Sequence, residues 1–451
     1  MTRFFGTDGV RGVADIELTQ GMAFALGEMA VTLLGPRLVV GRDTRLSGPS
    51  LEAALAAGIT SAGGTALLAG IIPTPAVALL TRTQTADGGV VISASHNPPE
   101  HNGIKFFDAQ GFKLTKELED EFEARLQSYV NTHDDTTKPP PLATAPQDDG
   151  GAFAREATER YIAHAVETVS GQGLDLVGLK IAVDTGYGAS CVTTPEALRR
   201  LGAEVVTINT TFDGARINVN CGSTHLEPLR ALVVESGADV GLAHDGDADR
   251  LLALDAGGNE VDGDFIEAII ALDLKARGLL THDTVVSTVL CNLGFVQAME
   301  GHGISVIQTA VGDSNVLAAM LEGGFSLGGE QSGHMILLEH NSTGDGLVTA
   351  LQLLSAQRRS GKPLTELSQV MTRFPQVLIN IRVKDREALG TSEAIAQAAE
   401  AATQRLAGQG RVLLRASGTE ALVRVMVEAA DEQAAQEEAG LLATLVKQEL
   451  A

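Results

Sequence analysis

The stretch LVVGRDTRLSGPSLEAALAAGITSAGGTALL, residues 38–68, predicts a β-strand, a helix and a second β-strand in that order. The apolar residues 38–40 are typical of a buried strand, and a polar loop follows them. Residues 50–61 place apolar side chains at helical spacing, and two glycines separate them from a strand at 65–68. Two strands joined through a helix form a βαβ unit with parallel strands, so this stretch predicts an α/β fold.

The same order of elements returns twice further along the chain. It is found over residues 180–208 and 284–308, each time with a polar turn after the first strand and a glycine before the second. Three copies predict three related α/β domains. Beyond about residue 370 the order becomes strand, helix, two strands and helix, which predicts a smaller α+β domain. The predicted domains are 1–150, 151–251, 252–368 and 369–451, with a Pro-rich linker at 131–150.

The charge of the chain restricts what it can bind. Its 57 acidic and 33 basic residues give a formal net charge of −24, which argues against nucleic acid and membranes as partners. The cysteines Cys191, Cys221 and Cys291 have no metal-ligand spacing and predict free thiols in a reducing cytoplasm. No targeting segment is visible, so we expect a cytoplasmic protein.

Residues 90–107, VVISASHNPPEHNGIKFF, combine a strand with a polar turn. Residues 90–92 are typical of a buried strand, and Asn97 followed by two prolines cannot continue it. Ser95 therefore lies just beyond the end of a strand. At this point three interpretations are open: Ser95 is a nucleophile, a phosphate carrier or an ordinary turn residue.

The segment DGDADR, residues 245–250, follows a predicted strand at 240–243. Asp245, Asp247 and Asp249 can converge on one point, and three carboxylates without Cys or His favour a hard cation, Mg²⁺ first. The alternative is a solvated acidic turn. An EF-hand does not fit, because its later ligands and flanking helices are missing.

The segment GGEQSGH, residues 328–334, carries three polar side chains in alternation. In an extended segment Glu330, Ser332 and His334 would share one face and could bind the hydroxyls or the amine of a sugar. Taken alone, His334 is more often a structural hydrogen-bonding residue.

The segment RASGTEA, residues 415–421, predicts a turn that can hold a phosphate. Small residues expose backbone N–H groups and hydroxyls, and an arginine fork matches phosphate oxygens. The candidate residues are Arg415, Ser417, Gly418, Thr419 and Arg424. The alternative is an ordinary hairpin turn.

Together these sites fit phosphoryl transfer through a phosphoserine. Ser95 would carry the group, and Mg²⁺ on the three aspartates would neutralise its charge and polarise the phosphorus. The sugar hydroxyl must also lose and regain a proton. The candidate acid/base residues are His96, Lys105 and, in a Gly-rich N-terminal loop, Arg11.

Four ordered motifs resemble those of the α-D-phosphohexomutase family over the whole chain. They are SASHNP with NGIK, DGDADR, GEQSGH and RASGTE. The resemblance implies three related α/β domains with mixed sheets and a C-terminal α+β domain like the TATA-binding protein, around a central cleft. It also implies that Ser95 carries the phosphoryl group.

Within the family the chain is most similar to bacterial members that act on glucosamine phosphates, through FFGTDGVRG (4–12), INVNCGSTH (217–225) and TAVGD (309–313). This implies interconversion of glucosamine 6-phosphate and glucosamine 1-phosphate through a 1,6-bisphosphate, feeding UDP-N-acetylglucosamine synthesis. It implies one Mg²⁺ per chain, held by Ser95 and the three aspartates, a sugar 1,6-bisphosphate as activator, and a homodimer. Glu330, Ser332 and His334 would bind the phosphorylated amino sugar, and the 415–424 segment its distal phosphate.

The chain departs from the family at three places, one of which, His101 before Asn102, is assigned no role. Ala416 and Ala421 stand where relatives commonly have prolines on either side of the predicted phosphate turn. We therefore expect this turn to be looser than in the relatives. Ser314 and Asn315 replace an Arg-Tyr pair, which puts any contact of that arginine in doubt.

Three other functions are weighed against this one. A phosphomannomutase or phosphoglucomutase of the same family differs mainly in the sugar loop, where Gln331 rather than Met favours glucosamine. A metal-dependent sugar phosphatase with an aspartate nucleophile would leave Ser95 without a role. A sugar-phosphate-binding protein without activity would need neither Ser95 nor the three aspartates.

Overall fold

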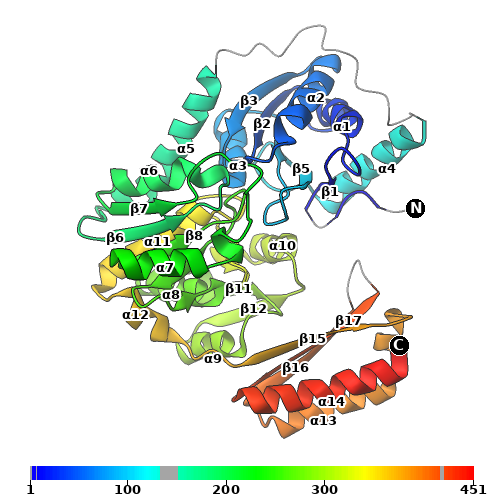
Figure 1. Ribbon diagram of the computed structural model, residues 1–451, viewed down its shortest axis with the longest axis vertical. Helices are drawn as coiled ribbons and strands as arrows, with labels where there is room; N and C mark the ends of the chain where they lie inside the picture. Colours follow the sequence, from blue (N-terminus) through cyan, green and yellow to red (C-terminus); the bar gives the residue numbers. More distant parts are fainter. Residues whose placement is uncertain (1–2, 7, 133–150, 417–420) are drawn as a thin grey trace. The chain divides into compact units, whose positions relative to one another are not determined.

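The computed structural model describes residues 3–6, 8–132, 151–416 and 421–451 (Figure 1). Its contacts divide the chain into two units, residues 1–290 with 304–370 and residues 291–303 with 371–451. None of the helices in these described ranges is long and apolar enough to cross a membrane.

The first sheet of the larger unit has the strand order β1-β5-β4-β2-β3. Strands β4, β2 and β3 are parallel, whereas β5 is antiparallel to β4, and β1 to β5. The strands are β1 (Val10–Val13), β2 (Arg37–Arg42), β3 (Thr65–Ile71), β4 (Gly88–Ile92) and β5 (His101–Phe107). The helices are α1 (Gln20–Leu33), α2 (Gly48–Ser61), α3 (Thr74–Thr83) and α4 (Lys116–Thr132).

Alternation of side chains along β2 explains how helices cover both faces of this sheet. Leu38 and Val40 are fully buried in an apolar core that also takes in residues of α1, α2 and α4. The opposite face at Gly41 lies against α3, because a Cβ there would be 2.6 Å from the Val77 side chain.

The second sheet has the order β10-β9-β8-β6-β7. Its strands are β6 (Lys180–Asp184), β7 (Glu204–Ile208), β8 (Val240–Ala243), β9 (Leu252–Asp255) and β10 (Glu260–Val261). Its helices are α5 (Ala152–Ser170), α6 (Thr193–Arg200) and α7 (Glu227–Ser236). Strand β9 pairs with β8, so this sheet continues past residue 251, where the sequence prediction ends the second domain.

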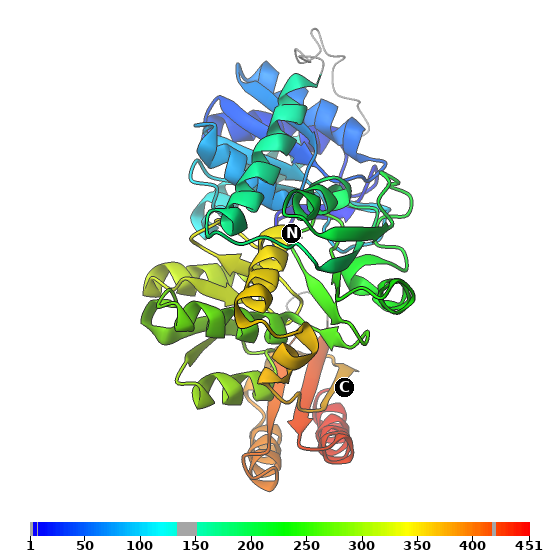
Figure 2. The ribbon, with the colours of Figure 1, turned by 90° about the vertical axis from the view of Figure 1, so that its left-hand side faces the viewer.

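Helix α5 contacts all three α/β domains of the larger unit. It packs against β3 and α3 of the first domain, α6 of the second, and the buried helix α11 (Gly346–Ser360) of the third. Figure 2 shows this teal helix crossing the blue first domain toward the yellow α11.

The third sheet has the order β12-β11-β13-β14. Its strands are β11 (Thr284–Thr288), β12 (Ser305–Thr309), β13 (Leu327–Gly329) and β14 (Met335–Leu337). The accompanying helices are α8 (Gly263–Ala276), α10 (Asp313–Gly323), α11 and α12 (Leu364–Leu367).

All three sheets share one four-strand core. In each, the first strand of the βαβ unit is central, the second lies at its side, a third parallel strand lies on the other side, and a fourth runs antiparallel to the third. The prediction of three related α/β domains with mixed sheets is confirmed. The connection between third and fourth strands is therefore equivalent in each domain, and it holds Ser95, the Asp245–Asp249 carboxylates and Glu330 respectively.

The smaller unit contains an antiparallel sheet in the order β15-β17-β16, covered by two helices. Its elements are α9 (Leu293–Gly301), β15 (Gln376–Arg382), α13 (Glu393–Arg405), β16 (Gly410–Ala416), β17 (Leu422–Ala429) and α14 (Glu432–Leu450). The predicted α+β C-terminal domain is confirmed. The segment before α9 joins this unit because Asn292 Nδ2 and the N–H of Leu293 donate to the buried Glu428 carboxylate.

Candidate active site

The three equivalent connections of the larger unit contact one another. The Ser95 hydroxyl donates a hydrogen bond of 2.6 Å to Asp245 Oδ2 of the second domain. Arg250, at the end of the same Asp-rich loop, forms a β-bridge with His334 of the third domain. The first three predicted motifs thus lie together, although they are far apart in the sequence.

Ser95 is buried and held in an uncommon backbone conformation. Its φ is +51°, in the left-handed region that few residues other than Gly adopt. The polar turn after β4 produces this geometry, since the N–H of Ser95 donates to the hydroxyl of Ser93 at 2.9 Å. The Ser95 hydroxyl consequently points at the Asp-rich loop.

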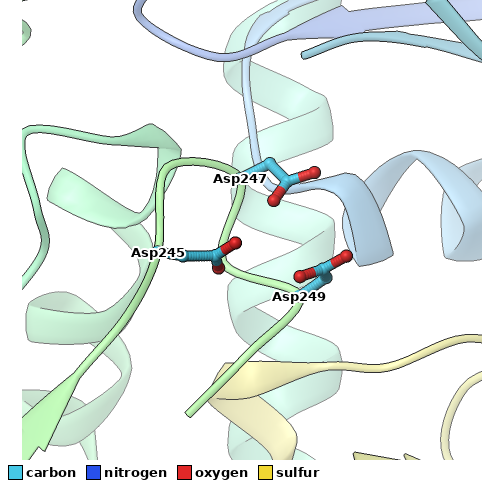
Figure 3. A group of neighbouring side chains, drawn as sticks. All are labelled: Asp245, Asp247 and Asp249. Atoms are coloured by element: carbon cyan, nitrogen blue, oxygen red, sulfur yellow. The ribbon is translucent and has the colours of Figure 1, made fainter. Parts of the chain in front are cut away.

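The carboxylates of Asp245, Asp247 and Asp249 converge within the loop between β8 and β9 (Figure 3). All three are buried, and one oxygen of each lies within 4.8 Å of the others. Each also has an Oδ1 atom without a hydrogen-bond partner among the described residues. Three oxygen donors with free lone pairs fit a hard divalent cation. The donor set and its burial fit a metal site, and the solvated-turn alternative does not fit this burial.

The surroundings shift the pKa values of Asp245 and Asp249 in opposite directions. Burial and the negative charges of Asp249 and Asp247 raise the pKa of Asp245 well above its usual value. Burial also acts to raise the pKa of Asp249, but His334, Lys105 and Arg250 outweigh it and lower that pKa. The repulsion at Asp245 is what a bound cation would relieve.

The three candidate acid/base residues lie around Ser95 and the aspartates. His96 Nδ1 is 3.3 Å from the Ser95 hydroxyl, and burial together with Arg250 and Arg11 lowers the pKa of His96 to about 4. Lys105 lies on β5, where burial acts to lower its pKa but Asp247 and Asp8 raise it above its usual value. Arg11 lies on the edge strand β1 and not in a loop as predicted, and it pairs with Asp8.

A buried network of charges connects this site with residues that the sequence did not single out. Lys105 Nζ lies 2.9 Å from Asp247 and 2.7 Å from Asp8. Asp8 also accepts from Lys113 at 2.6 Å, and Lys113 pairs in turn with Asp313. Asp313 and Asp249 each lie 3.5 Å from a ring nitrogen of His334. The chain of contacts thus leaves the Asp-rich loop at Asp247 and returns to it at Asp249.

The expectation of an extended segment at residues 328–334, the predicted sugar-binding loop, was wrong. Residues 330–333 form a tight turn between β13 and β14, closed by hydrogen bonds between Glu330 and His334 and between Gly333 and Glu330. Gly333 has φ +90°, and a Cβ there would be 2.1 Å from the Leu251 carbonyl oxygen. The three polar residues are consequently displayed by a turn and do not alternate along a strand.

Each polar residue of this turn has a different environment. Glu330 Oε1 accepts from the N–H of Gly312 at 3.2 Å, and Ser332 Oγ is buried without a partner among the described residues. Burial acts to lower the pKa of His334, but Asp249 and Asp313 raise it. Gln331 Nε2 donates to Asp264 at 3.2 Å.

Two residues of the predicted phosphate loop can be placed in the smaller unit. Arg415 on β16 is directly opposite Arg424 on β17, so both side chains leave the same face of the sheet. Burial and the charge of Arg424 lower the pKa of Arg415. Ser417, Gly418 and Thr419 lie outside the described residues. A pair of arginines on one face suits a phosphate group.

Comparison with known proteins identifies the family. Four stretches match the phosphoglucomutase/phosphomannomutase domains: 2–133 matches alpha/beta/alpha domain I, 159–258 domain II, 262–374 domain III and 378–445 the C-terminal domain. The chain belongs to the phosphohexomutase family. It is 49% identical over 460 residues to phosphoglucosamine mutase of Thermoanaerobacter sp. (strain X514) and 51% identical over 457 residues to that of Symbiobacterium thermophilum, covering 100% of each chain in both cases.

Solved structures of phosphohexomutases share the fold. A phosphoglucomutase/phosphomannomutase family protein from Burkholderia thailandensis superposes with a TM-score of 0.79 at 23% identity, covering 99% of this chain and 98% of that one. N-acetylphosphoglucosamine mutase of Aspergillus fumigatus, solved with GlcNAc-6P and magnesium, superposes with a TM-score of 0.67 at 18% identity, covering 99% and 96%.

Proposed function

We propose that this chain is a phosphoglucosamine mutase that interconverts glucosamine 6-phosphate and glucosamine 1-phosphate. Full-length relatives at about half identity carry this activity in their names. The observation that carries the chemical part of the proposal is the 2.6 Å contact between the Ser95 hydroxyl and the buried Asp245 carboxylate.

In the proposed reaction, Ser95 carries a phosphoryl group. A sugar-phosphate hydroxyl attacks this group, so that a sugar O–P bond forms while the Ser95 Oγ–P bond breaks, giving a sugar 1,6-bisphosphate. The bisphosphate reorients and returns its other phosphoryl group to Ser95. His96 is the acid/base candidate nearest to the Ser95 hydroxyl, and Lys105 and Arg11 are candidates alongside it.

The Asp-rich loop is the proposed site of one Mg²⁺ per chain, with Ser95 as a fourth ligand. The donors are all hard oxygens, and a magnesium-containing structure of a protein with this fold supports the choice. When bound, Mg²⁺ supplies positive charge that neutralises phosphoryl oxygens and polarises the phosphorus.

The remaining predicted residues are proposed to bind substrate. Glu330, Ser332 and His334 would bind the amino sugar. The buried Ser332 hydroxyl supports this, since it has no hydrogen-bond partner in the described part of the chain and an unpaired buried hydroxyl costs free energy. Arg415 and Arg424, with Ser417, Gly418 and Thr419, would hold the distal phosphate. A sugar 1,6-bisphosphate as activator, a homodimer and a cytoplasmic location complete the proposal. The three free cysteines are in keeping with a reducing compartment.

The substrate assignment is tested by a side-by-side assay. We expect kcat/KM for glucosamine 6-phosphate to exceed that for glucose and mannose phosphates by about 10-fold or more, since a neutral hydroxyl cannot replace the charge-assisted hydrogen bonds that a protonated amine donates. Higher kcat/KM with mannose or glucose phosphate would reject the glucosamine assignment. Release of inorganic phosphate as the main product would instead indicate a phosphatase.

A further inference from the structure

Arg45 is a fully buried arginine in the loop after β2 and has no part in the proposed chemistry. Its guanidinium lies behind the Ser95 turn and donates to backbone carbonyl oxygens there. Nη2 donates to Ser95 at 2.9 Å and to Asn97 at 2.8 Å, and Nη1 donates to His101 at 2.8 Å and to Pro98. A buried charge is costly unless it is paired and hydrogen-bonded. Four of the hydrogen bonds of Arg45 go to carbonyl oxygens of residues 95–101, which indicates a role in shaping that turn.

The carboxylate that balances Arg45 holds the other side of Ser95. Asp43 Oδ2 accepts from Arg45 Nε at 2.9 Å and from the Ser93 hydroxyl at 2.6 Å. Ser93 Oγ in turn accepts the N–H of Ser95 at 2.9 Å. The backbone N–H and C=O of Ser95 are therefore both anchored to one buried ion pair.

The second domain reaches the same carbonyl group. Asn218 Nδ2 donates to the carbonyl oxygen of Ser95 at 2.8 Å and to that of Asn97 at 3.2 Å. Gly246, inside the Asp-rich loop, approaches so closely that a Cβ there would lie 2.7 Å from the Ser95 carbonyl oxygen. The Ser95 carbonyl is thus enclosed by groups from two domains.

These contacts explain how Ser95 keeps a left-handed conformation. A residue other than Gly at φ +51° is strained, and such strain persists only where the surroundings fix the backbone. We propose that Arg45 and Asn218 are positioning residues that hold the Ser95 backbone in this conformation, so that Oγ faces the Asp245 carboxylate. This inference rests on the proposed function of Ser95 as phosphoryl carrier.

The inference is tested with Arg45→Lys and Asn218→Ala, with Arg42→Lys as matched control. Lys cannot reach four carbonyl oxygens, and Ala removes both bonds of Asn218. Arg42 pairs with Glu52 and donates to the backbone carbonyl of Asp43 at 3.3 Å, but it contacts neither the Asp43 carboxylate nor the Ser95 turn through a hydrogen bond. We expect kcat to fall about 100-fold in Arg45→Lys and at least about 10-fold in Asn218→Ala, with KM for glucosamine 6-phosphate nearly unchanged. Arg42→Lys should keep the kcat of the parent protein.

Amide hydrogen exchange over residues 93–97 gives a readout that does not depend on turnover. We expect faster exchange in both variants and no change in the control, because both variants lose bonds to the Ser95 carbonyl oxygen and the turn then opens more often. Unchanged exchange, or folded variants with normal kcat, would overturn the inference. If Arg45→Lys does not fold, Asn218→Ala decides, since it removes only a neutral donor. If the parent protein does not act on glucosamine phosphates, the proposed function fails, while exchange still decides whether the turn is held as described.

Discussion

Replacing Ser95 with alanine is expected to reduce turnover of glucosamine 6-phosphate at least about 1,000-fold, because the variant has no oxygen to carry the phosphoryl group. The variant should fold normally, since the lost hydroxyl has only a short hydrogen bond to Asp245 and a longer one to His96 among the described residues, and the turn is held through its backbone. A coupled assay with saturating sugar 1,6-bisphosphate measures the loss.

A second buried serine provides the control for this substitution. Ser355 on α11 is fully buried, and its hydroxyl has no partner in the described part of the chain. Ser355→Ala removes the same atom outside the site, and its activity should match the parent protein. If Ser95→Ala kept more than about a tenth of the activity, the phosphoserine mechanism would be wrong and an aspartate nucleophile would become the better explanation.

Removing divalent metal with a chelator is expected to lower activity about 100-fold or more, and added Mg²⁺ should restore it. A metal at a phosphoryl group supplies several kcal/mol of charge stabilisation, and each 1.4 kcal/mol corresponds to about tenfold in rate. The structural basis is the convergence of three buried carboxylates, each with an oxygen free of hydrogen bonds among the described residues.

Thermal unfolding separates metal binding from catalysis. Mg²⁺ should raise the Tm of the parent protein, because a ligand that binds only the folded state stabilises it. Asp245→Asn should lose this response and, without metal, should unfold at a higher temperature than the parent. The folded-state pKa of Asp245 is raised, so this carboxyl costs stability as the pH rises above its unfolded-state pKa, and Asn removes the cost. Full activity after chelation, or an equal Mg²⁺ response in Asp245→Asn, would contradict the assigned site.

The fold could be predicted because its signals are local. Apolar strands that end in polar turns, and glycines before the next strand, repeat three times, and the observed sheets repeat the same core. Ser95 and the three aspartates could be found for the same reason, since they directly follow predicted strands. The 2.6 Å contact between Ser95 and Asp245 joins the equivalent loops of two domains.

Other features depend on contacts between distant residues and were not visible in the sequence. Lys113 pairs with Asp8 and Asp313, which are 105 and 200 residues away. Arg45 is fully buried, although arginine is usually exposed. Nothing in the sequence around Arg45 therefore indicated that it lies behind the Ser95 turn. The sugar loop alternates polar residues as a strand would, but Gly333 turns it against Leu251 of another domain.

Peptide mass spectrometry of the purified protein tests the central claim most directly. The peptide containing Ser95 should carry a phosphoryl group after incubation with a sugar 1,6-bisphosphate, and glucosamine 6-phosphate should then remove the group and yield the bisphosphate. Phosphoryl groups on any other serine should not respond to the substrate. A protein that turns over glucosamine 6-phosphate while its Ser95 peptide never carries a phosphoryl group would contradict the role of Ser95 as carrier.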